Sequence, residues 1–285
     1  MNSAEQVSYP YWPVQVFEPK VAHVCLERSM IRRLLVSTTL VTALSLMAPA
    51  SVSVAWAQTA SPAPASVAPA KPKKVLKYLT AADIDPKRLL PAPPVDGSAM
   101  ALADLAELHR IIAARTLERL AQAQWDDDHE DASAFNATVA GGFDVAKLPI
   151  TAELLEVVNI DASLAGAAAK TLFARRRPWA VDTTIPTCDP NDAPLTSYPS
   201  GHSTRGYAIA MTYALLIPEK AQAFMSRGAD YAYSRQVCGS HYPSDTAASQ
   251  ALAAALVATL VKNPEFQAKI EAARTELRAA HLTGQ

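Results

Sequence analysis

Prolines divide the second half of the chain into segments of helix length. From about residue 151 onward alanine is abundant, and no stretch alternates between apolar and polar residues as a half-buried strand would. Proline has no amide hydrogen, so it fits the boundary or first turn of a helix but not its interior. The spacing predicts helices over about 151–177, 201–217, 219–236, 244–262 and 264–281, and an all-α fold. The prolines at their boundaries are Pro178, Pro199, Pro218, Pro243 and Pro264.

One further long helix is predicted upstream. Ser98 is a suitable N-cap, and apolar residues recur at three- to five-residue steps as far as about Trp125. The stripe consists of Leu102, Leu105, Leu108, Ile112, Leu117 and Leu120. The acidic run at 126–131 follows it, and contiguous side chains point in all directions, so we interpret this run as a solvated helix end without function.

Composition limits the class of protein. The chain has 285 residues, of which 50% are hydrophobic and 19% charged, so it can bury one sizeable core. Its formal net charge of -1 argues against a general nucleic-acid or anionic-membrane surface, and any attraction for anions should be local to a pocket. We expect a single helical domain at 75–285.

The N-terminal region has the three parts of a secretory signal. Two arginines precede an apolar run at 34–54, and Ala55-Trp56-Ala57 offers a small-x-small cleavage site. We expect translation to start at Met30 and cleavage to follow Ala57, so that 1–57 is an upstream extension plus signal peptide. An uncleaved membrane anchor is the alternative. The Ala- and Pro-rich stretch 58–74 is expected to be a flexible tether, and the mature protein periplasmic or secreted.

Cysteine usage agrees with export. Cys25 would be removed with the signal, which leaves Cys188 and Cys238 in an oxidising compartment, where a disulfide is expected. No Cys-x-x-Cys or His-x-x-x-His spacing indicates a zinc site. The apolar stretch 247–261 is too short to span a bilayer, so we expect a core helix and no membrane span after signal cleavage.

The first of three chemically suggestive blocks is Lys170 with Arg177-Pro178. The two cations are seven residues apart, which is two helical turns, so on one helix they share a face and can converge on one anion. Arg175 and Arg176 would point elsewhere and are expected to be surface charges. Alone, this spacing is usually a pair of solvated helix charges.

The second and third blocks add imidazoles. In Pro199-Ser200-Gly201-His202, a serine cap and a glycine open a helix, which creates an anion site with His202 in the first turn. In the third block Ser234-Arg235 ends one helix, and His241 precedes Asp245 by four residues. The Asp245 carboxylate can then accept the Nδ1 hydrogen of His241 and leave Nε2 free as a nucleophile.

Together the blocks match K-x6-RP, PSGH and SR-x5-H-x3-D without departure, and here the chain resembles the phosphatidic acid phosphatase type 2 superfamily. The resemblance is closest to the secreted class A bacterial non-specific acid phosphatases. It extends to the Pro-rich segment Leu90–Pro94, the run Ser234–Gly239 and the tail Asn263–Phe266. It implies a helical bundle of the phosphatase and haloperoxidase type.

The resemblance also implies a role for each residue. His241 would be the nucleophile that forms a phosphohistidine, Asp245 its orienting partner, and His202 the general acid. Phosphate would be bound by Lys170, Arg177, Ser200, Gly201 and Arg235. The substrates would be small phosphate monoesters, and no metal or other cofactor would be needed because fixed cations replace the metal.

Three other functions share parts of this pattern. Vanadium haloperoxidases use the same pocket but are generally much larger chains. Lipid phosphatases of this superfamily need several membrane spans, and a periplasmic phosphate-binding protein would need no histidines. The sequence does not name the alcohol, although we expect the loop 136–151 and the helix around Asn159 to shape its side of the site. It is compatible with a monomer or a homo-oligomer.

Overall fold

The computed structural model describes residues 74–138 and 142–284, and every regular element in these ranges is a helix. The α-helices are α1 Pro86–Leu89, α2 Ala99–Ala114, α3 Leu117–Asp128, α4 Pro149–Phe173, α5 Pro178–Val181, α6 Gly201–Leu216, α7 Ala221–Val237, α8 Pro243–Leu260 and α9 Pro264–Ala279. Short 3-10 turns occupy Ala132–Phe135, Val145–Lys147 and Pro218–Lys220. The expected all-α fold is confirmed. The signal-peptide prediction, and most of the tether, lie outside the described residues.

Proline residues mark most of the helix starts, as the sequence predicted. Pro149, Pro178, Pro243 and Pro264 each stand in the first turn of a helix, where their missing amide hydrogen costs nothing. The helix predicted to run to residue 177 ends earlier, because Ala174 adopts a left-handed conformation with φ of 43° after Phe173. Arg177 therefore lies beyond the helix that carries Lys170, and their predicted shared helical face is wrong.

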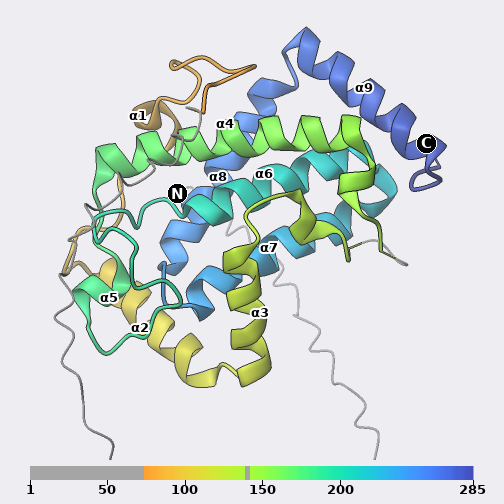
Figure 1. Cartoon of the computed structure of the whole chain (residues 1–285). Coiled ribbons are helices and arrows are strands. Elements are labelled where there is room, and N and C mark those ends of the chain that lie inside the picture. The colour runs from red at the N-terminus through yellow and green to blue at the C-terminus, as the bar shows by residue number, and fades with distance from the viewer. Residues whose placement is uncertain (1–73, 139–141, 285) are drawn as a thin grey trace, which may run out of the picture. The chain divides into compact units, whose positions relative to one another are not determined.

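The single helix predicted from Ser98 to Trp125 is two helices. Arg115 and Thr116 have extended backbone angles, and the Thr116 side chain accepts a hydrogen bond from the amide of Arg119, so it caps α3. The break lets α3 pack against α7 (Figure 1). Two members of the predicted apolar stripe, Leu102 and Leu117, are exposed to solvent.

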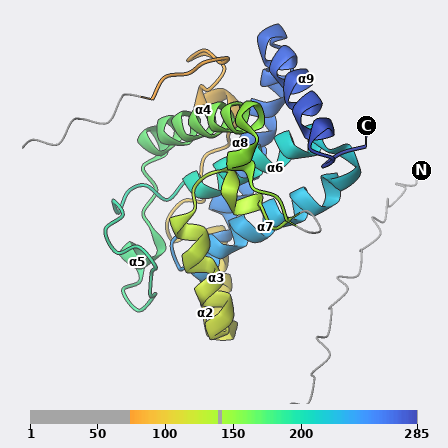
Figure 2. The same cartoon turned by 45° about the vertical axis from the view of Figure 1, so that its right-hand side comes forward.

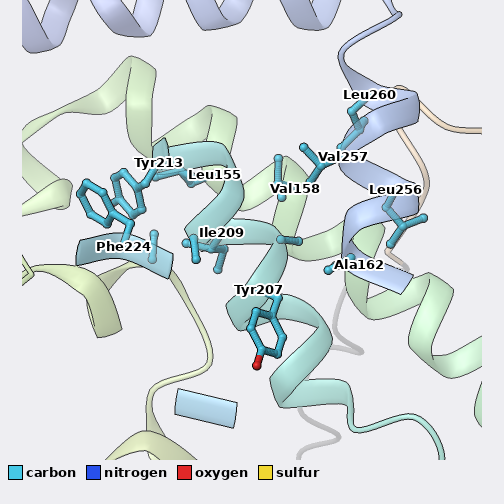
Figure 3. Packing of buried hydrophobic residues seen from close by; sticks show 14 of the residues in the cluster. Leu155, Val158, Ala162, Tyr207, Ile209, Tyr213, Phe224, Leu256, Val257 and Leu260 are labelled. Atoms are coloured by element: carbon cyan, nitrogen blue, oxygen red, sulfur yellow. The ribbon is translucent and has the colours of Figure 1, made fainter. Parts of the chain in front are cut away.

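Helix α6 is the centre of the packing. Helices α4, α7 and α8 all lie against it, and α9 packs on α4 (Figures 1 and 2). Its residues Ile209 and Tyr213 meet apolar side chains of the surrounding helices (Figure 3). The Tyr213 ring stacks on Phe224 of α7 with ring centroids 4.6 Å apart. Because nearly all of α6 is buried, its N-terminus is held in a fixed position by three neighbouring helices.

Two links hold the loops at the N-terminal end of α6. The predicted disulfide between Cys188 and Cys238 is present, and the Cys188 amide donates to the Cys238 carbonyl at 3.1 Å. Gly239 follows with φ of 67°, and a Cβ there would lie 2.1 Å from the Pro186 carbonyl oxygen, so only glycine fits. The disulfide thus joins the segment after Arg177 to the segment between α7 and α8.

The described helices differ from typical membrane spans in length or composition. None of them is long and apolar enough to cross a bilayer by itself. Only α8 and α9 together reach the length and composition of a span, and they meet at a bend of 96°.

Candidate active site

The predicted site residues come together where four helices end or begin. Lys170 lies in the last turn of α4, and Arg235 in the last turn of α7. Ser200 caps α6, and Asp245 lies in the first turn of α8. A pocket of about 210 Å³ opens beside Lys170 and Gly201, and Ser200, Arg235 and Asp245 are not part of its lining. Its lining consists of Glu130, Ser163, Ala167, Lys170, Arg177, Asp192, Gly201, His202 and Arg205.

His241 lies behind this lining and is only 1% exposed. Its Nε2 is 3.0 Å from Nη1 of Arg177. Its Nδ1 is 3.5 Å from Oδ2 of Asp245 and has no hydrogen-bond partner among the described residues, so the hydrogen bond predicted between them is not formed in this structure. Burial, and then the charge of Arg177, hold the pKa of His241 well below its usual value. Since Arg177 is always protonated, Nε2 must carry a lone pair and accept, so the imidazole is neutral. A neutral Nε2 among cations is a suitable nucleophile.

Asp245 is fully buried and takes part in a network that sequence reasoning missed. It accepts hydrogen bonds from Ser197 Oγ at 2.6 Å, from the Tyr242 amide at 2.9 Å and from Arg175 NH1 at 2.6 Å. Arg175 also contacts Asp104 at 2.9 Å. Burial raises the pKa of Asp245 to about 6, and Arg175 acts against this rise. The carboxylate is therefore fixed in place beside Nδ1 of His241.

Arg175 was expected at the surface, and that expectation is wrong. The residue is only 6% exposed, with its guanidinium 4.1 Å from the centre of the Tyr242 ring. The left-handed turn at Ala174 redirects the chain, so the helical face extrapolated from α4 does not apply to it. Arg176 does lie at the surface, where it pairs with the exposed Asp96.

The cations of the pocket are closely packed. Lys170 lies against Gly201, where a Cβ would be in ordinary van der Waals contact with Nζ at 3.5 Å. Burial and the neighbouring Arg177 lower the pKa of Lys170 to about 8. Arg177 donates to the Ser240 carbonyl at 3.0 Å and pairs with Asp192 at 2.8 Å. Two positive charges thus line the same pocket, where an anion would be favoured.

The N-terminus of α6 adds a further anion-binding feature. Ser200 is the N-cap, and its side-chain oxygen accepts from the Ser203 amide at 3.3 Å. The peptide bond between Tyr198 and Pro199 is cis. Gly201 and His202 form the first turn, where helix amides without intrahelical partners favour negative charge. The sequence prediction of a helix start at this block is confirmed.

The acidic run at 126–131 is a solvated helix end only in part: Asp128, Glu130 and Asp131 are exposed, but the other acidic residues are not. Asp126 is fully buried and pairs with Arg227 of α7 at 2.5 Å. Asp127 forms an ion pair with Arg235. Glu130 Oε1 lies 2.7 Å from His202 Nε2. Buried cations on two neighbouring helices thus organise a segment whose composition alone indicated solvent exposure.

His202 lies between carboxylates and cations. Its Nε2 contacts Glu130 and is 3.2 Å from the carbonyl oxygen of Asp127. Burial, and then the charge of Arg235, lower the pKa of His202 to about 4, although Glu130 acts in the opposite direction. An anion bound among these cations would raise that pKa again. Occupancy of the pocket and protonation of His202 are therefore coupled.

Other residues expected near the alcohol do not line the pocket. Neither the described part of the loop 136–151 nor Asn159 is in its lining, and the α4 side chains that are there are Ser163 and Ala167. Within the described ranges, one group of three metal-type ligands occurs, formed by Asp127 with Cys188 and Cys238. Both sulfurs belong to the disulfide, so they are not thiolate ligands.

Comparison with known proteins agrees with this architecture. Residues 152–268 match the family described as the PAP2 superfamily, a range that includes all three blocks. A non-specific acid phosphatase of Providencia stuartii is 36% identical over 201 residues, covering 68% of this chain and 81% of the relative. An acid phosphatase of Zymomonas mobilis is 35% identical over 207 residues, covering 70% and 78%. A non-specific acid phosphatase of Salmonella typhimurium is 29% identical over 224 residues, covering 72% and 89%.

The chain belongs to the PAP2 superfamily. Within that superfamily, its similarity is to bacterial enzymes named non-specific acid phosphatases.

Proposed function

We propose that the protein is an acid phosphatase that hydrolyses small phosphate monoesters through a phosphohistidine on His241. The observation that carries this proposal is a buried, neutral imidazole whose Nε2 faces the cations of an anion-sized pocket. The relatives named acid phosphatases support the reaction class.

In the first step, the phosphoryl group enters among Lys170, Arg177 and Arg235, with support from Ser200 and the amide of Gly201. His241 Nε2 gives up its contact with Arg177 and attacks phosphorus, forming the N–P bond as the ester P–O bond breaks. The electron pair of that bond goes to the ester oxygen, which takes a proton from His202 Nε2. Fixed cations offset the charge on the equatorial oxygens.

In the second step, a water molecule takes the place of the alcohol. His202, now neutral, accepts a proton from this water as the water oxygen bonds to phosphorus. The N–P bond breaks, its electron pair returns to Nε2 of His241, and inorganic phosphate leaves. Asp245, whose Oδ2 lies 3.5 Å from Nδ1, is the group proposed to orient the ring, and a hydrogen bond from Nδ1 to it would have to form in both steps.

The reaction is proposed to need no metal, because side-chain cations perform the charge stabilisation. Purified protein in excess EDTA should hydrolyse a panel of phosphate monoesters as fast as untreated protein. Loss of activity on chelation that is restored by added metal would refute metal independence.

Trapping the intermediate tests the nucleophile. Labelled substrate, quenched without acid, should leave label on His241 in the wild type. H241A should lose at least ~10³-fold in turnover while it still binds vanadate, since the cations remain. Label on Ser200, or unchanged turnover in H241A, would refute the assignment.

We also propose that the enzyme is periplasmic or secreted after cleavage following Ala57, with 58–74 as a tether and 75–285 as the catalytic domain. Mass spectrometry of the protein from the native host should find the new N-terminus at Gln58. A mature protein that still contains 34–54 would refute the cleavage.

A further inference from the structure

Two residues outside the three blocks, Glu130 and Arg205, flank His202 in the pocket. Arg205 follows His202 by three residues on α6, so both side chains leave the same face of the helix. Arg205 is only 8% exposed, and its Nε has no hydrogen-bond partner among the described residues. Because Arg205 also lines the pocket, its guanidinium can donate to an acceptor that enters there.

A single oxygen atom of Glu130 joins the two residues. Its Oε1 is 2.7 Å from His202 Nε2 and 2.7 Å from Arg205 NH2. One negatively charged oxygen therefore occupies a position bracketed by an imidazole and a guanidinium. These distances match those that an oxyanion site makes to the charge it stabilises.

The position of Glu130 Oε1 corresponds to that of a reacting atom if His202 is the general acid of the proposed reaction. The atom that must lie within hydrogen-bond reach of His202 Nε2 is then the ester oxygen of the leaving group. Glu130 Oε1 occupies that place in this structure. The Glu130 side chain is 47% exposed, so it can rotate toward solvent when a substrate enters.

We propose that Arg205 is a further catalytic residue, which together with His202 forms an oxyanion site for the leaving-group oxygen, and that Glu130 fills this site in the empty enzyme. As the P–O bond breaks, its electron pair moves to the ester oxygen. Arg205 NH2 donates a hydrogen bond to that oxygen while His202 Nε2 transfers its proton. This inference rests on the proposed phosphatase function and extends it to leaving groups that are poorly stabilised in water.

The test is a series of phosphate monoesters whose leaving-group pKa runs from nitrophenols to alkyl alcohols. In R205M, turnover of alkyl phosphates should fall on the order of 10²-fold, because one oxyanion donor is lost. Turnover of nitrophenyl phosphate should fall less than about 3-fold, since a good leaving group needs little stabilisation. The slope of turnover against leaving-group pKa therefore becomes steeper.

Matched variants separate this role from others. R227M also removes a partly buried arginine paired with the acidic run, but Arg227 does not line this pocket, so its slope should equal that of the wild type. R205K keeps the charge and should restore part of the alkyl turnover, which also covers the case in which R205M does not fold. E130A should keep the wild-type slope and bind vanadate more tightly, because the oxygen that fills the site is gone.

Three results would overturn the proposal. An equal loss across the series in R205M, with weaker vanadate binding, would place Arg205 on a non-bridging phosphoryl oxygen. A steeper slope in E130A equal to that in R205M would make Glu130 the functional group. An unchanged slope in R205M would remove Arg205 from the reaction. Failure of the wild type to hydrolyse any ester would instead refute the phosphatase function itself.

Discussion

Replacement of Arg175 by methionine tests the buried network behind the nucleophile. The change leaves Asp104 and Asp245, which are 8% and 0% exposed, without their shared cation. Removing one partner of a buried ion pair costs about 3–5 kcal/mol, since the other charge stays desolvated. Arg176 is the matched control, because its contact with Asp96 is exposed and such pairs contribute about 0–1 kcal/mol.

The assay is urea unfolding of the wild type, R175M and R176M, followed by circular dichroism. With a slope of about 2–3 kcal/mol per molar urea, the midpoint of R175M should fall by more than about 1 M, and that of R176M by less than about 0.5 M. Turnover of R175M should fall at least ~10-fold, because without Arg175 the pKa of Asp245 rises further above about 6 and its carboxylate is lost near neutral pH. Equal midpoints for the two variants would refute the reasoning.

Three further predictions concern the loops and the acid. The disulfide between Cys188 and Cys238 closes a loop of 50 residues, so C188S/C238S should be less stable by about 4 kcal/mol and melt about 10 °C lower; two free thiols in the unreduced wild type would contradict it. G239A should lose at least ~1 kcal/mol because of its positive φ and the close Pro186 carbonyl, and an unchanged melting temperature would argue against that contact. Activity requires protonated His202, whose pKa in the empty pocket is about 4, so kcat/KM should fall as pH rises above that value while kcat, measured with bound phosphate, falls at higher pH. In H202N neither kcat/KM nor kcat should show this fall with rising pH. If kcat/KM and kcat of the wild type fell at the same pH, the coupling between anion binding and His202 protonation would be contradicted.

The helices could be predicted from the sequence because proline acts locally. Pro243 and Pro264 restrict only their own turn and the residue before, so their positions locate helix starts without knowledge of the packing. The break at Thr116 was missed, because threonine is compatible with a helix interior and becomes a cap only when α3 can pack on α7. The left-handed conformation of Ala174 was also missed, because glycine is the usual sequence signal for that conformation at a helix end and the chain has alanine there.

The residues of the three blocks were predicted together because their spacing is a pattern. Glu130 and Arg205 belong to no such pattern, and each alone resembles a surface charge. Their position depends on how α3 packs on α7 and how α7 packs on α6, which no local propensity describes. A signal did exist for Arg205, because it follows His202 by three residues and therefore shares its helix face. The acidic run at 126–131 carried no local signal of its burial, because its partners lie about 70 to 110 positions away in the sequence.

The pairing of the pocket cations has a consequence for product release. Two of the three cations in the pocket lining already hold a carboxylate, Arg177 with Asp192 and Arg205 with Glu130, and Arg235, which is outside the lining, pairs with Asp127. A cradle of unpaired cations would hold inorganic phosphate as firmly as it holds the ester, and turnover would then be limited by departure of the product. Carboxylates that can re-form their own pairs compete with the departing phosphate. We therefore expect an enzyme that tolerates high concentrations of its own product.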